Sequence, residues 1–231
     1  LAAWELKALA TDAGLRPEKR LAVARLLAEG GRFRAAIRET ENLVRELGGI
    51  QYPPAYPEVV AGLLYPRFYE PIARREAEKY GLDARLVLAV IREESRFEAT
   101  IVSGAGAQGL MQIMPATGRG MASAMGVAEF RVSDLNDENI NIALGTHYLN
   151  HLMGRYDNRL HVALAGYNAG PGNVERWLRE SNAADPELWV EKIPFSETRN
   201  YVKKVLGSYW TYRQLDGDPF VEQPLTLAEV D

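Results

Sequence analysis

Apolar residues recur at helical spacing along most of the chain, beginning with three short stripes in the first 49 residues. Apolar positions three or four apart mark one face of a helix, so the stripes predict three helices separated by turns. Their members are Trp4, Ala8 and Leu9; Leu21, Ala24, Leu27 and Ala28; and Phe33, Ala36, Ile37, Thr40, Leu43, Val44 and Leu47. Glycines at positions 14, 30–31 and 48–49 are expected to end these helices. Such an arm resembles an α-solenoid too short to stand alone, so we expect it to lean on the next domain.

A proline-rich stretch separates this arm from the rest of the chain. Residues 51–71 contain five prolines, and prolines at that density interrupt helices. We therefore divide the chain into a helical arm or linker region, 1–64, and a main domain, 65–231.

The helical pattern resumes beyond this boundary, and no segment shows the alternation of a convincing strand. Helices are predicted over 72–80, from an N-cap at Asp83 to about Arg96, from Pro115 onward, and over 139–156, 160–167, 172–180 and 197–214. A glycine-rich turn is expected at 103–109. The predicted fold class is all-α, or mainly α.

Two adjacent glutamates near the end of the helix that begins after Asp83 differ in the direction they are predicted to face. On a helical wheel, Glu94 falls in the centre of an apolar arc, whereas Glu93 falls at its edge, toward two arginines. The arc consists of Leu86, Val87, Val90 and Ile91, and Leu88 is the one large apolar residue outside it. Glu93 is therefore expected to be solvated or paired with arginine, and Glu94 to point into apolar surroundings.

Burial would suit Glu94 to proton donation. A low dielectric disfavours the carboxylate and raises its pKa, as a general acid for glycosidic bond cleavage requires. The wheel leaves an alternative equally open, in which Glu94 is buried in an ion pair with an arginine from another helix.

Composition and charge exclude several classes of function. The formal net charge is only −4, so no bulk attraction to nucleic acid or to an anionic membrane is expected. The chain has no cysteine, which rules out disulfides and thiolate metal sites. No apolar run approaches the roughly 18 residues of a membrane span. The chain begins at Leu1 rather than Met, as expected of a processed or truncated product.

Two histidines have a spacing that can bind zinc, but other signs of a metal site are missing. His147 and His151 lie four residues apart, yet the residue after His147 is Tyr148, not the glutamate of a zinc protease. We interpret them as a surface pair, and expect neither metal nor cofactor. A glycine-flanked nucleophilic serine and a phosphate-binding loop are also absent from the sequence.

Four blocks in a fixed order resemble the signature of the soluble lytic transglycosylases, which share the goose-type lysozyme fold. The blocks are ESRF at 94–97 with SGAGAQGLMQIMPAT at 103–117; Asn141-Ile142 with Gly145 and Tyr148-Leu149; AGYNAGPG at 165–172; and IPFSETRNYV at 193–202. The likeness spans roughly residues 65–212, and the preceding arm is similar to the linker region of the large soluble enzymes. The family usually has Asp-Pro-Glu where this chain has Asp137-Glu138-Asn139, and an alanine where it has Gly118; both differences put local helix starts in doubt.

This resemblance implies a reaction on glycan strands of peptidoglycan, in the periplasm or cell envelope. The enzymes cut the β-1,4 bond between N-acetylmuramic acid and N-acetylglucosamine, and the muramoyl C6 hydroxyl closes on C1 to give a 1,6-anhydro end. By this likeness Glu94 acts first as general acid and then as base, without nucleophile, metal or cofactor. Protein partners, if any, would belong to cell-wall synthesis or remodelling.

The resemblance also implies a set of substrate-binding residues, each with a simpler structural explanation. Glycines permit tight turns and close approach of a sugar, amides and hydroxyls can bond sugar groups, and methionines are adaptable apolar surfaces that are as often core. The candidates are Ser103, Gly109, Met111, Gln112, Met114, Tyr167, Asn168 and Glu197. Ser103 could instead be a turn residue, and Glu197 a helix N-terminal carboxylate with Arg199 nearby.

Two rival functions remain open at this point. A hydrolytic goose-type lysozyme would use water and a second carboxylate, for which Asp134, Asp137 or Glu197 are candidates. A catalytically silent glycan-binding or scaffold module would bind without cleaving.

Overall fold

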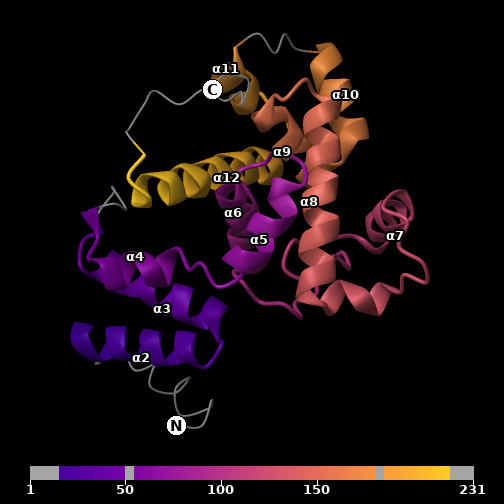
Figure 1. Ribbon diagram of the computed structural model, residues 1–231. Helices are drawn as coiled ribbons and strands as arrows, with labels where there is room; N and C mark the ends of the chain where they lie inside the picture. Colours follow the sequence, from indigo (N-terminus) through magenta and orange to yellow (C-terminus); the bar gives the residue numbers. More distant parts are fainter. Residues whose placement is uncertain (1–15, 50–54, 181–184, 219–231) are drawn as a thin grey trace.

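The computed structural model describes residues 16–49, 55–180 and 185–218, and their regular structure is helical throughout (Figure 1). The described elements, in chain order, are α2 (Pro17–Glu29), α3 (Phe33–Glu46), α4 (Glu58–Leu64), α5 (Glu70–Glu78), α6 (Ala84–Ser95), α7 (Pro115–Ala124), the 3-10 helix η2 (Val132–Asn136), α8 (Glu138–Arg155), α9 (Leu160–Ala169), α10 (Pro171–Glu180), α11 (Pro186–Glu191) and α12 (Ser196–Leu215). Extended pairing in these residues is limited to single bridges at Val102–Gln108 and Gln108–Ile113. The all-α prediction is confirmed.

Helices α2, α3 and α4 pack on one another and form the arm (Figure 1). The second and third predicted helices are present, and α2 ends at Gly30 as expected; the first falls outside the described residues. Helix α4 was not expected in the proline-rich stretch. It forms because Pro57 stands at its N-cap, where a proline costs no helical hydrogen bond, and because no proline lies inside the helix.

The arm does lean on the main domain, as its length predicted. Phe33 and Ile37 from α3 belong to the same continuous apolar core as α6, α9 and α12, while only Val23, Leu27 and Ala36 form a separate small cluster. The arm therefore shares its core with the domain that carries the predicted catalytic helix.

Helix α6 lies at the centre of the main domain, between α5 and α12 (Figure 1). Residues 86–91 are fully buried without exception, including Leu88 and Ala89 outside the predicted arc. The predicted arc is therefore buried, but burial extends beyond it to all sides of the body of this helix. Packing on several sides buries a helix all round, and the charged residues of α6 lie only in its first and last turns.

The ends of the helices follow the local signals closely. Asp83 caps α6 by accepting a hydrogen bond from the Arg85 N–H at 2.8 Å. Asp137 caps α8 in the same way through the amides of residues 139 and 140, so this helix starts without the proline usual in the family. Helix α7 runs through Gly118, where a Cβ would meet the Phe130 ring at 3.1 Å. Helix α11 and η2 were not predicted.

The described helices include none that combines the length and apolarity of a membrane span.

Candidate active site

Glu94 stands on the last turn of α6, largely enclosed but with part of its surface exposed. Its pKa is raised from 4.5 to about 7, mainly because burial disfavours the charged carboxylate. The negative charges of Glu93 and Glu197 raise it further, and the hydroxyl of Tyr201 partly offsets both effects. Glu94 thus has a pKa near neutral pH while part of its surface remains exposed.

Two tyrosines lie beside this carboxyl, Tyr201 buried and Tyr167 partly buried. Tyr201 of α12 directs its hydroxyl at Glu94, although the contact falls short of a regular hydrogen bond. The negative charge of Glu94 raises the pKa of Tyr167 of α9. The Tyr167 hydroxyl donates to the Met111 carbonyl at 2.9 Å. Burial holds the pKa of both tyrosines well above the ordinary value, so both remain O–H donors.

The ion pair considered for Glu94 belongs instead to its neighbour. Arg92 donates to the Glu93 carboxylate, and Ser208 of α12 donates to the same oxygen at 2.6 Å. Within the described residues, no salt bridge reaches Glu94. Glu93 is therefore paired with arginine, one of its two predicted outcomes, and the alternative of an arginine-paired Glu94 is wrong.

The loop that follows α6 is held by one buried side chain. Asn141 of α8 accepts from the Met111 N–H at 2.8 Å and donates to the carbonyls of Gln108 and Leu135 at 2.9 and 2.8 Å. Gly109 has a φ of +79° and lies so close that a Cβ would fall 2.1 Å from the Asn141 amide nitrogen. Gly109 is thus explained by packing and by its backbone conformation.

Ser103 and Gln112 also make bonds inside this loop. The Ser103 hydroxyl accepts from the Ala107 N–H at 3.0 Å, as the turn interpretation predicted. Gln112 adopts a left-handed φ of 48°, and its amide nitrogen donates to the carbonyls of Gly109 and Ile101 at 2.9 and 3.2 Å. These bonds shape the loop, while the remaining acceptor of the Gln112 amide is available for a ligand.

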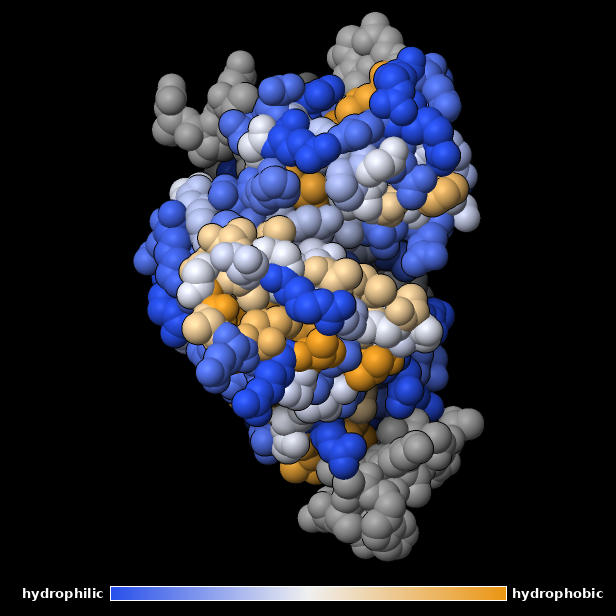
Figure 2. Space-filling model, turned by 90° about the vertical axis from the view of Figure 1, so that its right-hand side faces the viewer, coloured by the Kyte–Doolittle hydropathy of each residue, from blue (hydrophilic) through white to orange (hydrophobic). Residues whose placement is uncertain are grey.

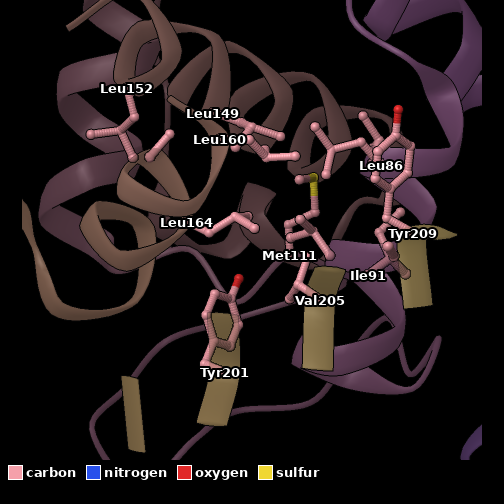
Figure 3. Packing of buried hydrophobic residues seen from close by; sticks show 14 of the residues in the cluster. Leu86, Ile91, Met111, Leu149, Leu152, Leu160, Leu164, Tyr201, Val205 and Tyr209 are labelled. Atoms are coloured by element: carbon pink, nitrogen blue, oxygen red, sulfur yellow. The ribbon is translucent and has the colours of Figure 1, made fainter. Parts of the chain in front are cut away.

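The two candidate methionines occupy opposite environments. Met111 is fully buried and packs against Gly145, where a Cβ would clash with its sulfur at 2.4 Å. Figure 3 shows its side chain among the leucine, isoleucine and valine residues of the core. Met114 is 42% exposed. The structure therefore gives Met111 the core role and leaves Met114 at the surface.

A pocket of about 250 Å³ opens between this loop, α8 and α9. Its lining consists of Gln112, Ile113, Met114, Thr117, Tyr148, Tyr167, Asn168, Ala169 and Gly170. Four of the predicted residues line it together; Ser103, Gly109, Met111 and Glu197 do not. Glu94 does not line this pocket, but Tyr167 lines it and is also affected by the Glu94 charge.

The face that contains α7 carries few charges near this pocket. Figure 2 shows a band of mostly apolar and neutral side chains across its middle, interrupted by a hydrophilic side chain, with mainly hydrophilic residues above and below. Arg119 is the one charged residue of α7. A neutral polymer with apolar ring faces suits such a surface better than a charged one.

Asn168 and Glu197 are placed differently with respect to the pocket. Asn168 lines it and accepts a hydrogen bond from the Thr198 hydroxyl at 2.7 Å, which fixes its amide. Glu197 is exposed on the first turn of α12, near enough to raise the Glu94 pKa. Arg199 donates to the Ile193 carbonyl at 2.9 Å, and no ion pair joins it to Glu197 in the described chain.

Several residues at the site were missed by the sequence analysis. Tyr201, Tyr148, Thr117 and Asn141 all lie inside or beside the quoted blocks, so their position in those blocks was the available signal. The directions of their side chains could not be read from the sequence, because Tyr201, Tyr148 and Asn141 are placed by packing between helices that are distant in sequence.

His147, one member of the histidine pair, contacts a tyrosine. The His147 ring nitrogen Nδ1 lies 3.0 Å from the Tyr80 hydroxyl, and within the ranges that the structure describes no three His, Asp or Glu side chains gather as metal ligands would.

Comparison with known proteins supplies the family. The model of the transglycosylase SLT domain matches residues 71–190, just over half of the chain. The soluble lytic murein transglycosylase of Salmonella typhimurium is 37% identical over 155 residues, which cover 66% of this chain and 24% of that protein. This chain therefore spans about a quarter of the length of that relative.

Solved structures agree in fold. An inactive mutant of the lytic transglycosylase Slt from Pseudomonas aeruginosa matches with a TM-score of 0.79 and 31% identity, over 96% of this chain and 33% of that one. The 70 kDa soluble lytic transglycosylase of Escherichia coli matches with a TM-score of 0.79 and 29% identity, over 93% and 33%. The chain belongs to the transglycosylase SLT domain family, the family of the soluble lytic murein transglycosylases.

Proposed function

We propose that this chain is the catalytic part of a lytic transglycosylase, which cleaves the β-1,4 bond between N-acetylmuramic acid and N-acetylglucosamine in peptidoglycan and leaves 1,6-anhydromuramic acid ends. The observation that carries the proposal is Glu94, a carboxyl with a pKa of about 7 on the central helix of a chain of this family. A protein with this substrate would work in the cell envelope.

In the proposed reaction Glu94 gives up one proton in the first step and takes up another in the second. It first donates its proton to the glycosidic oxygen as the bond from C1 to that oxygen breaks. The C6 hydroxyl oxygen of the muramoyl residue then bonds to C1, and its proton passes to the Glu94 carboxylate. The acid is regenerated and no water is consumed. A pKa near the working pH suits a group that must serve as acid and then as base.

The surroundings of Glu94 support a single carboxyl in both roles. It has an O–H donor, Tyr201, rather than a fixed cation beside it, so the carboxylate formed after the first step is stabilised only weakly and readily takes up a proton. The Pseudomonas aeruginosa enzyme of known structure is an inactive mutant with glutamine in place of one glutamate. An essential glutamate in that relative supports an essential glutamate here.

The hydrolytic rival has one remaining candidate for its second carboxylate. Asp134 accepts from the Arg131 N–H at 2.8 Å, and Asp137 caps α8, so both are used in local structure. Glu197 stays exposed near Glu94 and would have to activate the water.

The mass of the products distinguishes these functions. Purified sacculi digested by the protein should release anhydro-muropeptides, which are one water lighter than hydrolysed products. Glu94→Gln should lower the release by roughly a thousandfold, since it removes the general acid, while the exposed Glu98→Gln variant keeps the wild-type rate. Hydrolysed products would establish a lysozyme, and an active Glu94→Gln variant would refute the role of Glu94.

A further inference from the structure

The last turn of α6 is tied to the arm by one carboxylate. Glu41 of α3 places one oxygen 2.6 Å from Arg96 Nη1 and the other 3.5 Å from Arg92 Nη2. The two arginines lie one helical turn apart and bracket Glu94 in sequence. Glu41, more than 50 positions upstream, thus forms ion pairs with both ends of the turn that carries the candidate acid.

Arg92 connects these ion pairs to the rest of the domain. It is buried, it donates from Nε to the Leu64 carbonyl at the end of α4 at 2.8 Å, and its guanidinium lies 4.4 Å from the centre of the Tyr65 ring. Its Nη1 donates to Glu93 and to Ser208 of α12, the latter at 3.3 Å. Arm, central helix and α12 meet at this one side chain.

Arg96 is a residue whose backbone needs such support. It ends α6 in the left-handed conformation, with a φ of 52°, and Phe97 follows with a φ of 64°. Two successive residues with side chains rarely adopt this conformation unless the surrounding structure holds them. Phe97 is held by burial and by a hydrogen bond from its N–H to Ser95 Oγ at 3.1 Å. Arg96 is partly exposed and is held by Glu41.

We propose that Glu41 of the arm is a positioning residue for the last turn of α6. Through its ion pairs with Arg92 and Arg96, Glu41 keeps the Glu94 side chain in its enclosed position. The inference rests on the proposed function, because it concerns the same carboxyl. It gives the arm a part in catalysis that a spacer would not have. Glu41 itself does not line the pocket, so it would act only through the two arginines.

Loss of the ion pairs of Glu41 with Arg92 and Arg96 should change proton transfer by Glu94 more than it changes substrate binding. The groups that face Glu94 are Glu93 on its own helix, Tyr201 and Glu197 on α12, and Tyr167 on α9. A looser turn would let water reach the carboxyl and lower its pKa, since burial is the main cause of its elevation. The basic limb of the pH–rate profile should then move to lower pH.

The test measures rates on purified sacculi over a range of pH with the Glu41→Gln variant of the full chain. We expect kcat to fall roughly tenfold, as small misplacements of a catalytic group do, with KM unchanged and the basic limb displaced toward acid. Arg96→Gln should reproduce these changes from the other side of the pair, and Arg96→Lys should restore part of the rate. Glu46→Gln is the matched control, because Glu46 lies on the same helix and pairs with Arg20 inside the arm.

The outcomes separate this inference from the proposed function. If Glu41→Gln and Arg96→Gln keep the wild-type kcat and pH profile while Glu94→Gln is inactive, the positioning role is wrong and the proposed function stands. If they lose activity only in proportion to the unfolded fraction, with an unmoved basic limb, the role is merely structural and the inference is overturned. If Glu41→Gln does not fold, Arg96→Gln and Arg96→Lys decide between these results.

Discussion

Glu93 and Glu94 are adjacent in sequence but belong to two different regions of the molecule. Glu93 faces the junction of arm, α6 and α12, where an arginine and a serine both donate to its carboxylate. The groups that act on Glu94 are a tyrosine hydroxyl and other carboxylates, and its pKa rises to about 7. The comparison shows that surroundings, not residue type or burial alone, decide whether a carboxyl is a structural charge or a proton donor.

The sharpest test of this difference is how the protonation of Glu94 makes the free energy of unfolding depend on pH. Its folded pKa of about 7 exceeds the ordinary 4.5, so the folded protein binds the proton more tightly than the unfolded chain. The stability that this provides is complete below about pH 4.5 and is lost as pH rises through about 7, by up to about 3 kcal/mol. Glu94→Gln removes the cost of charging, so it should unfold at a higher temperature than wild type at pH 8, with a smaller difference at pH 5.

Thermal unfolding of both proteins at several pH values checks this expectation. Glu98→Gln serves as control, because Glu98 is exposed and its substitution should leave the pH dependence unchanged. Equal unfolding temperatures of wild type and Glu94→Gln across the range would show that Glu94 is not held in its neutral form by burial.

The same substitution at Glu93 should have the opposite sign. Glu93→Gln leaves Arg92, which is about 10% exposed, with Glu41 as its remaining carboxylate at 3.5 Å. Breaking a buried pair from one side leaves a charge partly uncompensated, and we expect a loss of about 2 kcal/mol in the free energy of unfolding near neutral pH. Denaturant unfolding measures it. A Glu93→Gln variant as stable as wild type would mean that Ser208 and Glu41 suffice to hold the guanidinium.

Sequence reasoning predicted most of the described helices, and the reasons for its success and its limits differ. Asp83 and the glycines at 30–31 act locally, so the start of α6 and the end of α2 could be predicted from neighbouring residues alone. Glu94 is largely enclosed, as the wheel indicated, but its neighbours include a tyrosine hydroxyl and two carboxylates rather than apolar groups alone. The wheel also placed Glu93 toward arginine correctly, but it did not predict the burial of Leu88, which is covered by helices from other parts of the chain that no local pattern encodes.

In the candidate site, too, some features could be predicted from local sequence and others depended on packing with distant helices. Gln112, Met114, Tyr167 and Asn168 came from ordered blocks and do line one pocket. Met111 was in the same block but is core, because Gly145 of α8 leaves room for its sulfur. Whether a residue of such a loop faces the pocket or the core depends on a partner helix, and sequence spacing does not reveal that partner.

Tyr201 offers the finest probe of the contrast between the two glutamates. Its hydroxyl favours the Glu94 carboxylate and so holds the Glu94 pKa below the value that burial alone would give. Tyr201→Phe removes only this oxygen, and the pKa of Glu94 should rise, moving the basic limb of the pH–rate profile to higher pH by about half a unit or less, as a weak neutral donor would. Tyr209→Phe is the matched control, because Tyr209 lies on the same helix and donates to Asp83 at 3.1 Å, at the other end of α6. A basic limb that moved to lower pH in Tyr201→Phe would show that the hydroxyl stabilises the protonated acid instead, and the electrostatic description of Glu94 would have to be reversed at that contact.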